Sequence, residues 1–418
     1  MVDGIDTSLG KGGSQDVQDA LPVAASSAVG ADKGRGPPPA DAHGRRAAKP
    51  RRRKPRKDAP SVAKALPPAK NGPDISTASA SPRWPQLDRL PPRRSYAAID
   101  LGTNNCRLLI AKPSSDGFIV VDAFSRVVRL GEGLAATGRL SDAAMDRAVA
   151  ALSICADKLK RRHVTLARSV ATEACRRASN GAAFIRRVEE ETGILLDVIT
   201  AEEEARLAVL GCHVLLTPGG GPALIFDIGG GSTELVLVAT EDGAPRILDW
   251  ESAPWGVVSL TESEQFDADD PTARLEAYLA MRARVAASFA EFRARLPREI
   301  DAPLRLLGTS GTVTTLASVH LDLPAYDRRA IDGLIVPAEA MRTISRDLSV
   351  MSAPERMALP CIGRERADLV VAGCAILETI LDLWPAQQLC VADRGIREGI
   401  LRTLMYSDAT LPRTGRAR

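Results

Sequence analysis

Short apolar runs bounded by turn-forming residues divide the chain, from Arg94 onward, into strand and helix patterns. Three apolar runs separated by an Asn turn and a Ser-Ser-Asp-Gly turn predict an antiparallel meander. Helical spacing of apolar residues then alternates with short apolar runs, which indicates an α/β chain. The predicted elements are strands over 96–101, 107–112 and 118–130, a helix over 141–161, a strand over 166–171, a helix over 182–191, a strand over 195–200, and a helix that opens at Glu202 with Thr200 as its cap.

The same pattern restarts after a Gly- and Pro-rich break at 217–222. The predicted elements are strands over 223–228, 234–240 and 246–251, a helix over 272–296, strands over 304–307 and 389–392, and a helix over 396–405. The order strand, Asp-led loop, strand, turn, strand therefore occurs twice. An internal repeat of this kind predicts two similar α/β domains that flank a cleft.

Three polar loops follow buried strands of this pattern: Asp100-Leu-Gly-Thr-Asn, Asp227-Ile-Gly-Gly-Gly-Ser-Thr and Gly308-Thr-Ser-Gly-Thr. Small and hydroxyl-bearing residues at a strand end present N–H groups and hydroxyls that can hold an anion. The first two loops begin with a carboxylate, which suits a hard divalent cation. Because Asp227 follows Asp100 by 127 residues, at the same point of the repeat, we expect one phosphate and its metal to be held from two sides.

Composition narrows the class of protein. The 418 residues are 45% hydrophobic and include seven cysteines without metal-type spacing, which predicts free thiols in a reducing compartment. No apolar stretch approaches the roughly 20 residues that cross a bilayer, and the N-terminus lacks a signal-peptide pattern. These observations argue against a membrane or disulfide-rich secreted protein, and we expect a cytoplasmic location.

Charge is distributed unevenly along the chain. Residues 1–94 hold 18 Lys and Arg against 9 Asp, and since the whole chain carries +3, the remainder carries −6. The Pro, Gly, Ala and Ser around the basic run at 45–57 predict a disordered tail. This tail either solubilises the protein or binds a polyanion such as nucleic acid, ribosome or polyphosphate.

Six ordered motifs carry a family resemblance: YAAIDLGTNNCRLLI, SVATEACRRASN, VITAEEEARLAVLG, ALIFDIGGGSTELVLV, LLGTSGTVTTLA and VADRGIREGIL. Together they resemble the Ppx/GppA phosphatases, which include exopolyphosphatases and guanosine pentaphosphate phosphohydrolases. The resemblance implies two RNase H-like domains of the actin–Hsp70–sugar kinase superfamily around a central cleft. It implies a short form without an extra C-terminal helical module. The expected organisation is a disordered basic tail over 1–94, domain I over 95–210, domain II over 211–395, a helix over 396–407 that returns to domain I, and a tail over 408–418.

The resemblance also implies roles for residues of the motifs. Mg²⁺ or its waters would be oriented by Asp100, Asp227 and Glu234. Phosphate oxygens would be bound by Thr103, Asn104, Gly229, Gly230, Gly231, Ser232, Thr233 and Arg176. From the residues alone, Glu234 is also compatible with an exposed strand position, and Arg176 with an interdomain salt bridge.

Hydrolysis of a phosphoanhydride needs a carboxylate that takes a proton from the attacking water. The run Glu202-Glu203-Glu204 offers three, and matching AEEEAR to the family motif places the catalytic base at Glu204, with Glu203 as the alternative. The third loop, 308–312, contacts either a base or only phosphates. Arg107 lies near the first loop, where it either serves the site or faces solvent.

We therefore expect a Mg²⁺-dependent exopolyphosphatase that releases terminal orthophosphate from polyphosphate. The alternatives are a guanosine pentaphosphate 5′-phosphohydrolase, a non-catalytic protein that binds polyphosphate or an alarmone, and, less favoured, a kinase or ATPase of the superfamily. Because dimers are common in this family, a homodimer is a further expectation.

Overall fold

The computed structural model describes residues 94–115, 117–216, 221–240, 245–264, 266, 269–296 and 304–410. The chain divides into two units, Met1–Gly72 and Pro73–Arg418, and every described residue belongs to the second. The predicted tail over 1–94 thus lies outside the described residues except for Arg94, as do residues 411–418.

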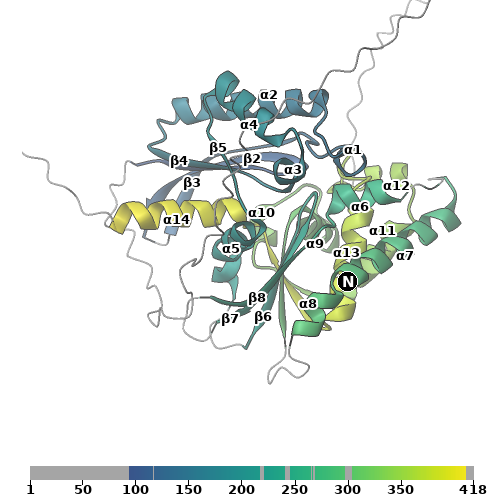
Figure 1. The fold of residues 1–418 in the computed structure, drawn as a ribbon. Coiled ribbons are helices and arrows are strands. Elements are labelled where there is room, and N and C mark those ends of the chain that lie inside the picture. The colour runs from purple at the N-terminus through teal and green to yellow at the C-terminus, as the bar shows by residue number, and fades with distance from the viewer. Residues whose placement is uncertain are drawn as a thin grey trace, which may run out of the picture. The chain divides into compact units, whose positions relative to one another are not determined.

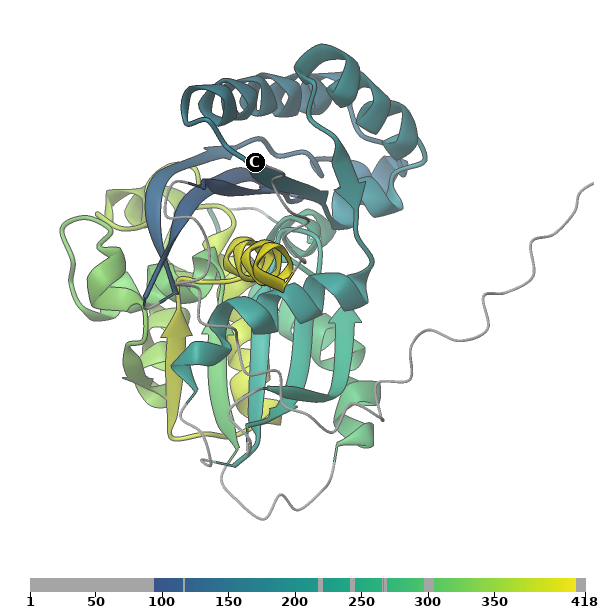
Figure 2. The same ribbon diagram turned by 90° about the vertical axis from the view of Figure 1, so that its left-hand side faces the viewer.

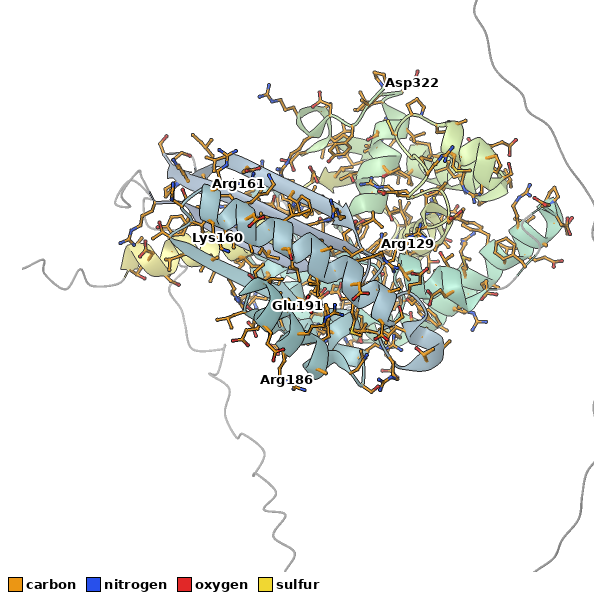
Figure 3. The ribbon with its side chains drawn as sticks, turned by 90° about the horizontal axis from the view of Figure 1, so that it is seen from above. Arg129, Lys160, Arg161, Arg186, Glu191 and Asp322 are labelled. Atoms are coloured by element: carbon orange, nitrogen blue, oxygen red, sulfur yellow. The ribbon has the colours of Figure 1, made fainter. Side chains whose placement is uncertain are left out.

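The first lobe is built on a five-stranded sheet. Its elements are β1 (Tyr96–Leu101), β2 (Asn105–Ser114), β3 (Gly117–Val127), α1 (Leu134–Thr137), α2 (Asp142–Arg161), β4 (Leu166–Ala171), α3 (Glu173–Arg177), α4 (Gly181–Thr192), β5 (Leu196–Val198) and α5 (Ala201–Cys212). The strand order is β3-β2-β1-β4-β5, with β1 antiparallel to β2 and parallel to β4. Helices α2 and α4 cover its outer face, as seen from above in Figure 3.

The second lobe is built on a six-stranded sheet in the order β10-β11-β9-β6-β7-β8. Its strands are β6 (Ala223–Ile228), β7 (Thr233–Ala239), β8 (Arg246–Ala253), β9 (Arg305–Thr309), β10 (Ile335–Pro337) and β11 (Gln388–Ala392). Its helical segments are η3 (His213–Leu215), α6 (Val257–Ser263), α7 (Pro271–Ser288), α8 (Ala290–Arg295), α9 (Gly311–His320), α10 (Arg328–Ile331), α11 (Ala338–Val350), α12 (Ala353–Ala358), α13 (Val370–Leu383) and α14 (Ile396–Thr410).

The two sheets repeat one topology. When β6, β7, β8, β9 and β11 are matched in turn to β1, β2, β3, β4 and β5, the second sheet has the same strand order as the first. Strand β10 is an additional strand at the edge. The register shift between the second and third strands falls at Ile110/Ala111 and again at Leu237/Val238, 127 residues apart. This order of three antiparallel and two parallel strands is that of an RNase H-like domain, so the predicted α/β class with two such domains is confirmed.

Two helices lie between the sheets (Figures 1 and 2). Helix α5 contributes Leu207 and Ala208 to the core on the first sheet, and Ala205 and Val209 to the core on the second. Helix α14 packs through residues such as Ile400 on the same face of the first sheet, although it follows β11 of the second lobe. It runs to Thr410, beyond the predicted helix over 396–405 and the predicted C-terminal segment over 396–407.

Cap residues explain where several helices begin. Ser141 accepts a hydrogen bond from the N–H of Ala144 at the start of α2, and Thr200 accepts one from the N–H of Glu203 at the start of α5. The α2 helix ends in basic residues, including Lys160 and Arg161, which complement the helix dipole (Figure 3). In the described part of the chain, no helix combines the length and hydropathy needed to cross a bilayer.

Candidate active site

The two Asp-led loops occupy equivalent places in the two sheets. Asp100 lies near the end of β1, opposite Arg107 of β2, and Asp227 lies near the end of β6, opposite Glu234 of β7. Both strands end at the boundary between the lobes, and both aspartates line one pocket of about 130 Å³. The repeat predicted from the sequence therefore brings the two carboxylates to a common site.

Most of the residues predicted for the site line this pocket. They are Asp100, Thr103, Asn104, Glu204, Asp227, Gly229, Gly230, Gly231, Ser232 and Glu234. Thr233 is fully buried beside the pocket, and its hydroxyl donates to the carbonyl oxygen of Trp255 at 2.7 Å. Arg176 does not line the pocket, and its guanidinium contacts two carboxylates that do, Glu173 and Glu204. These two side chains thus differ from the other predicted site residues, because they have protein partners and do not line the pocket.

The same hydrogen bonds shape both loops. The N–H of Gly102 donates to the carbonyl oxygen of Asn105, and the N–H of Gly229 donates to that of Ser232, both at 2.9 Å. In the first loop, the carbonyl oxygen of Asn104 accepts from two N–H groups of the chain that follows β3. One of these belongs to Arg129, labelled in Figure 3, whose φ of 47° is uncommon for a residue other than glycine.

The second loop is held in the same manner by the start of α6. The N–H groups of Val257 and Val258 donate to the carbonyl oxygens of Gly229 and Gly230 at 2.9 and 2.8 Å, and the Ser259 hydroxyl donates to that of Gly231 at 3.1 Å. The loop carbonyl oxygens therefore accept hydrogen bonds from α6 and are not left to repel an anion in the pocket.

Glycine is required where the two loops touch. A Cβ at Gly230 would lie 2.9 Å from the Cβ of Thr103, and one at Gly231 would lie 2.8 Å from both the Thr103 hydroxyl and the Cγ of Glu173. Real Cβ atoms do not approach this closely, so any side chain would separate the loops. The glycines predicted to admit phosphate also permit the contact between the lobes.

Among the described residues, neither aspartate carboxylate has a hydrogen-bond partner. The Oδ1 atom of Asp100 is buried without a hydrogen bond, and within the described residues no hydrogen bond reaches the Asp227 carboxylate. Burial raises the pKa of Asp227 to about 6, against the effect of the Arg107 charge. Burial likewise raises the pKa of Asp100, while Arg107 and Arg397 oppose the shift.

Glu234 is buried rather than exposed, which removes the alternative of a solvent-facing strand residue. Its Oε1 atom accepts hydrogen bonds from the hydroxyls of Ser232 at 2.7 Å and Ser252 at 3.0 Å. Burial, followed by the charge of Asp227, raises the pKa of Glu234 to about 7, and the two serine hydrogen bonds oppose the shift. These two hydrogen bonds fix the orientation of the Glu234 carboxylate at the pocket wall.

Of the three consecutive glutamates, only Glu204 lines the pocket. Glu202 is exposed, and Glu203 forms ion pairs with Arg168 at 2.9 Å and Arg206 at 2.6 Å. Glu204 is buried in the first turn of α5 and accepts a hydrogen bond from Arg176 at 2.9 Å. Burial and the nearby charge of Glu234 raise the pKa of Glu204 well above its usual value, although Arg176 opposes the shift.

Arg176 connects this carboxylate to the protein around it. Its guanidinium also donates to Glu173 at 3.1 Å and to the carbonyl oxygen of Ile199 at 2.8 Å. Because Glu173 and Glu204 stand on α3 and α5, the arginine fixes the position of α5 against α3. It can therefore orient the Glu204 carboxylate without touching a ligand.

The third loop completes the pocket. Ser310, Gly311 and Thr312 line it at the start of α9, where a helix N-terminus favours negative charge. Ser310 has φ 129° and ψ 171°, a combination that is essentially restricted to glycine. Its hydroxyl accepts from the N–H of Val313 at 3.4 Å. A strained residue at the edge of a pocket is typical of a functional loop.

Comparison with known proteins agrees with this geometry. The Ppx/GppA phosphatase family matches residues 109–408. The chain belongs to this family. It is 33% identical to "Exopolyphosphatase 2" of Mycobacterium tuberculosis over 326 residues, which cover 74% of this chain and 98% of the relative.

Solved structures of Ppx/GppA proteins share the fold. A family member from Aquifex aeolicus has 28% identity and a TM-score of 0.62, with 75% of this chain and 98% of that one covered. An exopolyphosphatase from Cytophaga hutchinsonii has 25% identity and a TM-score of 0.66, with 75% and 98% covered. The predicted family and its two-lobed fold are therefore confirmed, and with them the coarse class of phosphatase.

The donor set of this Ppx/GppA pocket suits a hard cation. Asp100 and Asp227 offer carboxylate oxygens without other partners, which is the chemistry that Mg²⁺ prefers. In the part of the chain that the structure describes, no group of three or more His, Cys, Asp or Glu is placed to hold one metal ion. A cation here would thus complete its shell with water and ligand oxygens, as Mg²⁺ commonly does.

Sequence reasoning did not single out several residues of the pocket. Arg107, left open between site and solvent, lines it, and so does Glu173, which the family motif TEACR contained but did not mark. Arg366 also lines it and donates to the Thr315 hydroxyl at 2.8 Å. The signal for Arg107 was its register opposite Asp100, which appears only once the strands are paired.

Proposed function

We propose that the protein is a Mg²⁺-dependent exopolyphosphatase, which releases terminal orthophosphate from inorganic polyphosphate. The observation that carries this proposal is the position of Glu204, a buried carboxylate held by Arg176 in the pocket that both Asp-led loops line. Support for the substrate comes from "Exopolyphosphatase 2" of M. tuberculosis, which matches across nearly its whole length.

In the proposed reaction, Glu204 is the general base that takes a proton from the attacking water. A raised pKa makes a carboxylate a stronger base, and the hydrogen bond from Arg176 favours its ionised form and orients it. The terminal phosphoryl group would be bound by the loops at 102–105 and 229–232, through N–H groups and the hydroxyl of Thr103, whereas the Ser232 hydroxyl donates to Glu234.

A cation is needed for electrostatic reasons. Five carboxylates and two arginines of the described residues line the pocket, so an empty, ionised site repels a polyanion. Asp100 and Asp227 would hold Mg²⁺, with Glu234 beside them. The bound ion supplies positive charge for the phosphate oxygens.

The test is orthophosphate release from polyphosphate, with and without Mg²⁺, by the wild type and by Glu204→Gln. Loss of the base should lower kcat by roughly 10²- to 10⁴-fold. Glu203→Gln is the matched control: it removes the neighbouring carboxylate, which is ion-paired outside the pocket, and should retain activity within a few fold.

Measuring guanosine pentaphosphate beside polyphosphate distinguishes the two substrates of the family. A higher kcat/KM for the nucleotide would replace the proposed substrate and leave the chemistry intact. Equal rates for Glu204→Gln and the wild type would remove the base from the mechanism, and metal-independent turnover would remove the cation.

The basic tail is proposed to help capture long chains. The residues that follow it carry a net charge of −6, so a tail of +9 offsets their repulsion of a polyanion. Deleting residues 1–93 should raise KM for long polyphosphate at low salt and leave kcat unchanged. A KM that does not move at low salt would show that the tail serves only solubility.

A further inference from the structure

A second cavity, of about 380 Å³, lies on the other side of α14 from the pocket described above. It shares no lining residue with that pocket: Ile396 of α14 lines the first, whereas Glu398 and Arg402 of the same helix line the second. Its wall on the first lobe is formed by Phe118 and Val120 of β3. The second lobe contributes α10 and the chain before α14, so the cavity lies between the lobes.

Four arginines face this cavity, and two of them are neutralised by carboxylates. Arg328 is paired with Glu398 at 3.0 Å and with Asp393 at 3.1 Å, and Arg394 is paired with Asp332 at 2.6 Å. These pairs use all three carboxylates and fix the cavity wall. They leave the other two arginines without an ion pair among the described residues, although the charge of Glu398 also acts on Arg402.

The unpaired arginines are Arg402 and Arg329. Within the described residues, no hydrogen bond or ion pair reaches either guanidinium, and the Nε atom of Arg402 is buried. The Arg402 guanidinium lies 5.8 Å from the ring centre of Phe118, which orients it at the cavity wall. Burial and the charge of Arg394 lower the pKa of Arg402, against the effect of the Glu398 charge. The pKa of His213 is lowered by burial and by the charge of Arg402.

The buried Nε atom of Arg402 has no hydrogen-bond partner, which costs free energy that a bound anion recovers, whereas Arg329 is exposed. Planar guanidinium groups bind phosphate oxygens through paired N–H donors, and two of them at one cavity suit a doubly charged tetrahedral anion. We propose that this cavity is a second binding site for a phosphate-class anion, held by Arg402 and Arg329 between the lobes. The anion is either free orthophosphate or the terminal phosphoryl group of a chain.

The position of the site has a structural consequence. The carbonyl oxygen of Arg394 accepts a hydrogen bond from the Thr309 hydroxyl at 2.6 Å, and Thr309 precedes Ser310 of the active pocket. The cavity wall at Arg394 is therefore one hydrogen bond away from the third loop, while the proposed ligands Arg402 and Arg329 lie outside the first pocket.

Equilibrium dialysis of the full-length protein against labelled orthophosphate tests the proposal. The wild type should bind one molar equivalent more than Arg402→Gln/Arg329→Gln, whatever the occupancy of the active pocket. Arg402→Lys retains the charge but not the paired donors, and should weaken the additional site several-fold. An adequate fold is checked by turnover, which the variants should retain because neither residue lines the active pocket.

The matched control removes two exposed arginines elsewhere, Arg161 of α2 and Arg186 of α4 (Figure 3). Arg161→Gln/Arg186→Gln should bind as much orthophosphate as the wild type. Unlabelled tripolyphosphate distinguishes the sources: displacement of the additional equivalent assigns the site to chain ends as well, and retention assigns it to free orthophosphate. Equal stoichiometry in the wild type and the folded Arg402→Gln/Arg329→Gln variant, or an equal loss in the control, would overturn the site.

Discussion

At the scale of single residues, the buried carboxylates of the active pocket destabilise the folded protein when they are ionised. Folding raises the pKa of Glu234 from 4.5 to about 7, chiefly because burial disfavours the ionised carboxylate. The folded protein thus holds this proton more tightly than the unfolded chain. As pH rises from about 4.5 to about 7, the unfolded state loses its proton first, so the free energy of unfolding falls. Asp227, raised to about 6, acts in the same direction.

Replacing Glu234 by Gln should therefore stabilise the protein at high pH and inactivate it. A shift of one pKa unit corresponds to about 1.4 kcal/mol, so at pH 8 the variant should gain about 1 to 3 kcal/mol in the free energy of unfolding. At pH 4, where Glu234 is protonated in both states, the gain should disappear. Gln retains an Oε1 acceptor for Ser232 and Ser252. Denaturant unfolding at both pH values measures the difference.

The exposed Glu202→Gln controls for the loss of one negative charge from the molecule, and should change stability by less than about 0.5 kcal/mol at either pH. If Glu234→Gln gained the same stability at pH 4 and pH 8, the destabilisation would not arise from the ionised Glu234 carboxylate.

At the scale of elements, the local pattern predicted most of the fold, because strands and capped helices are encoded over short stretches. The Thr200 cap and the strand at Tyr96–Leu101 were predicted to the residue. The predicted helix over 272–296 is interrupted at Phe289, whose side chain is fully buried and whose ring lies tilted against that of Trp384, with 5.9 Å between the ring centres. The short β10 was missed, since it is a strand only by pairing with β11.

The site was predictable as far as its motifs extended. Asp100 and Asp227 are marked by a repeated pattern, and Glu204 by its place before Ala205-Arg206. Arg107 reaches the pocket because β2 pairs with β1 and because the second lobe approaches the first. No local sequence pattern encodes this approach. The glycine contacts with Thr103 were hidden for the same reason.

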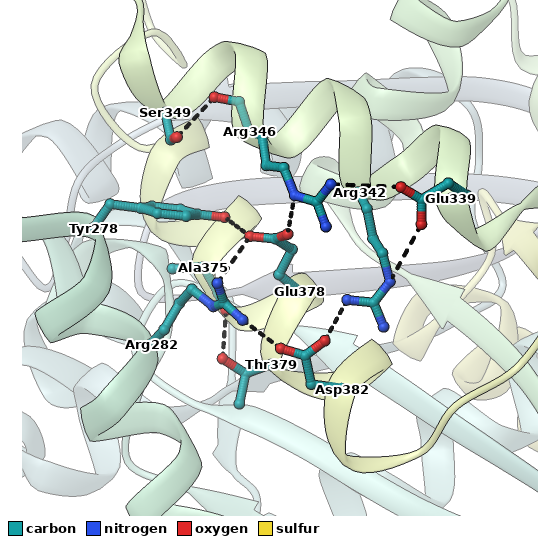
Figure 4. Close-up of polar contacts among 10 residues, drawn as sticks. All are labelled: Tyr278, Arg282, Glu339, Arg342, Arg346, Ser349, Ala375, Glu378, Thr379 and Asp382. Atoms are coloured by element: carbon teal, nitrogen blue, oxygen red, sulfur yellow. Dashed lines mark hydrogen bonds and ion pairs between the residues drawn. The ribbon is translucent and has the colours of Figure 1, made fainter. Parts of the chain in front are cut away.

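A buried ionic network holds the helices of the second lobe together (Figure 4). Glu378 of α13 is almost fully buried and accepts hydrogen bonds from Tyr278 of α7 at 2.6 Å and from Arg346 of α11 at 3.2 Å. Arg282 of α7 lies 3.5 Å from the same carboxylate and also pairs with Asp382. One carboxylate therefore joins three helices.

Glu378→Ala should destabilise the protein by about 2 to 4 kcal/mol, because the buried Tyr278 hydroxyl loses its partner and Arg282 and Arg346 each lose one of their carboxylates. Tyr278→Phe removes a single hydrogen bond and should cost about 1 to 2 kcal/mol. The control is Glu339→Ala, at the exposed edge of the same network, where the expected cost is below 1 kcal/mol. Denaturant unfolding ranks the three variants. A similar cost for Glu378→Ala and Glu339→Ala would show that burial of the network contributes nothing.

At the scale of the molecule, one helix is shared by both cores. The sides of α5 pack on different sheets, and its first turn carries Glu204 into the pocket between the lobes. Its position depends on a close crossing with α14. A Cβ at Gly399 would lie 2.0 Å from the carbonyl oxygen of Leu207, and one at Gly211 would lie 2.0 Å from that of Gly395.

Gly399→Ala should therefore affect stability and turnover together. The added methyl group cannot be accommodated unless α14 moves away from α5, and overpacking of this kind costs about 1 to 3 kcal/mol. Since α5 carries Glu204, kcat should fall at least about tenfold even where the variant is fully folded, because misplacement by about 1 Å is costly in catalysis. Ser407→Ala, an exposed position on the same helix, is the control and should leave both quantities unchanged. Thermal unfolding and orthophosphate release, measured on the same samples, separate the two effects. Loss of stability with an unchanged kcat would mean that the crossing supports the fold but does not position the base.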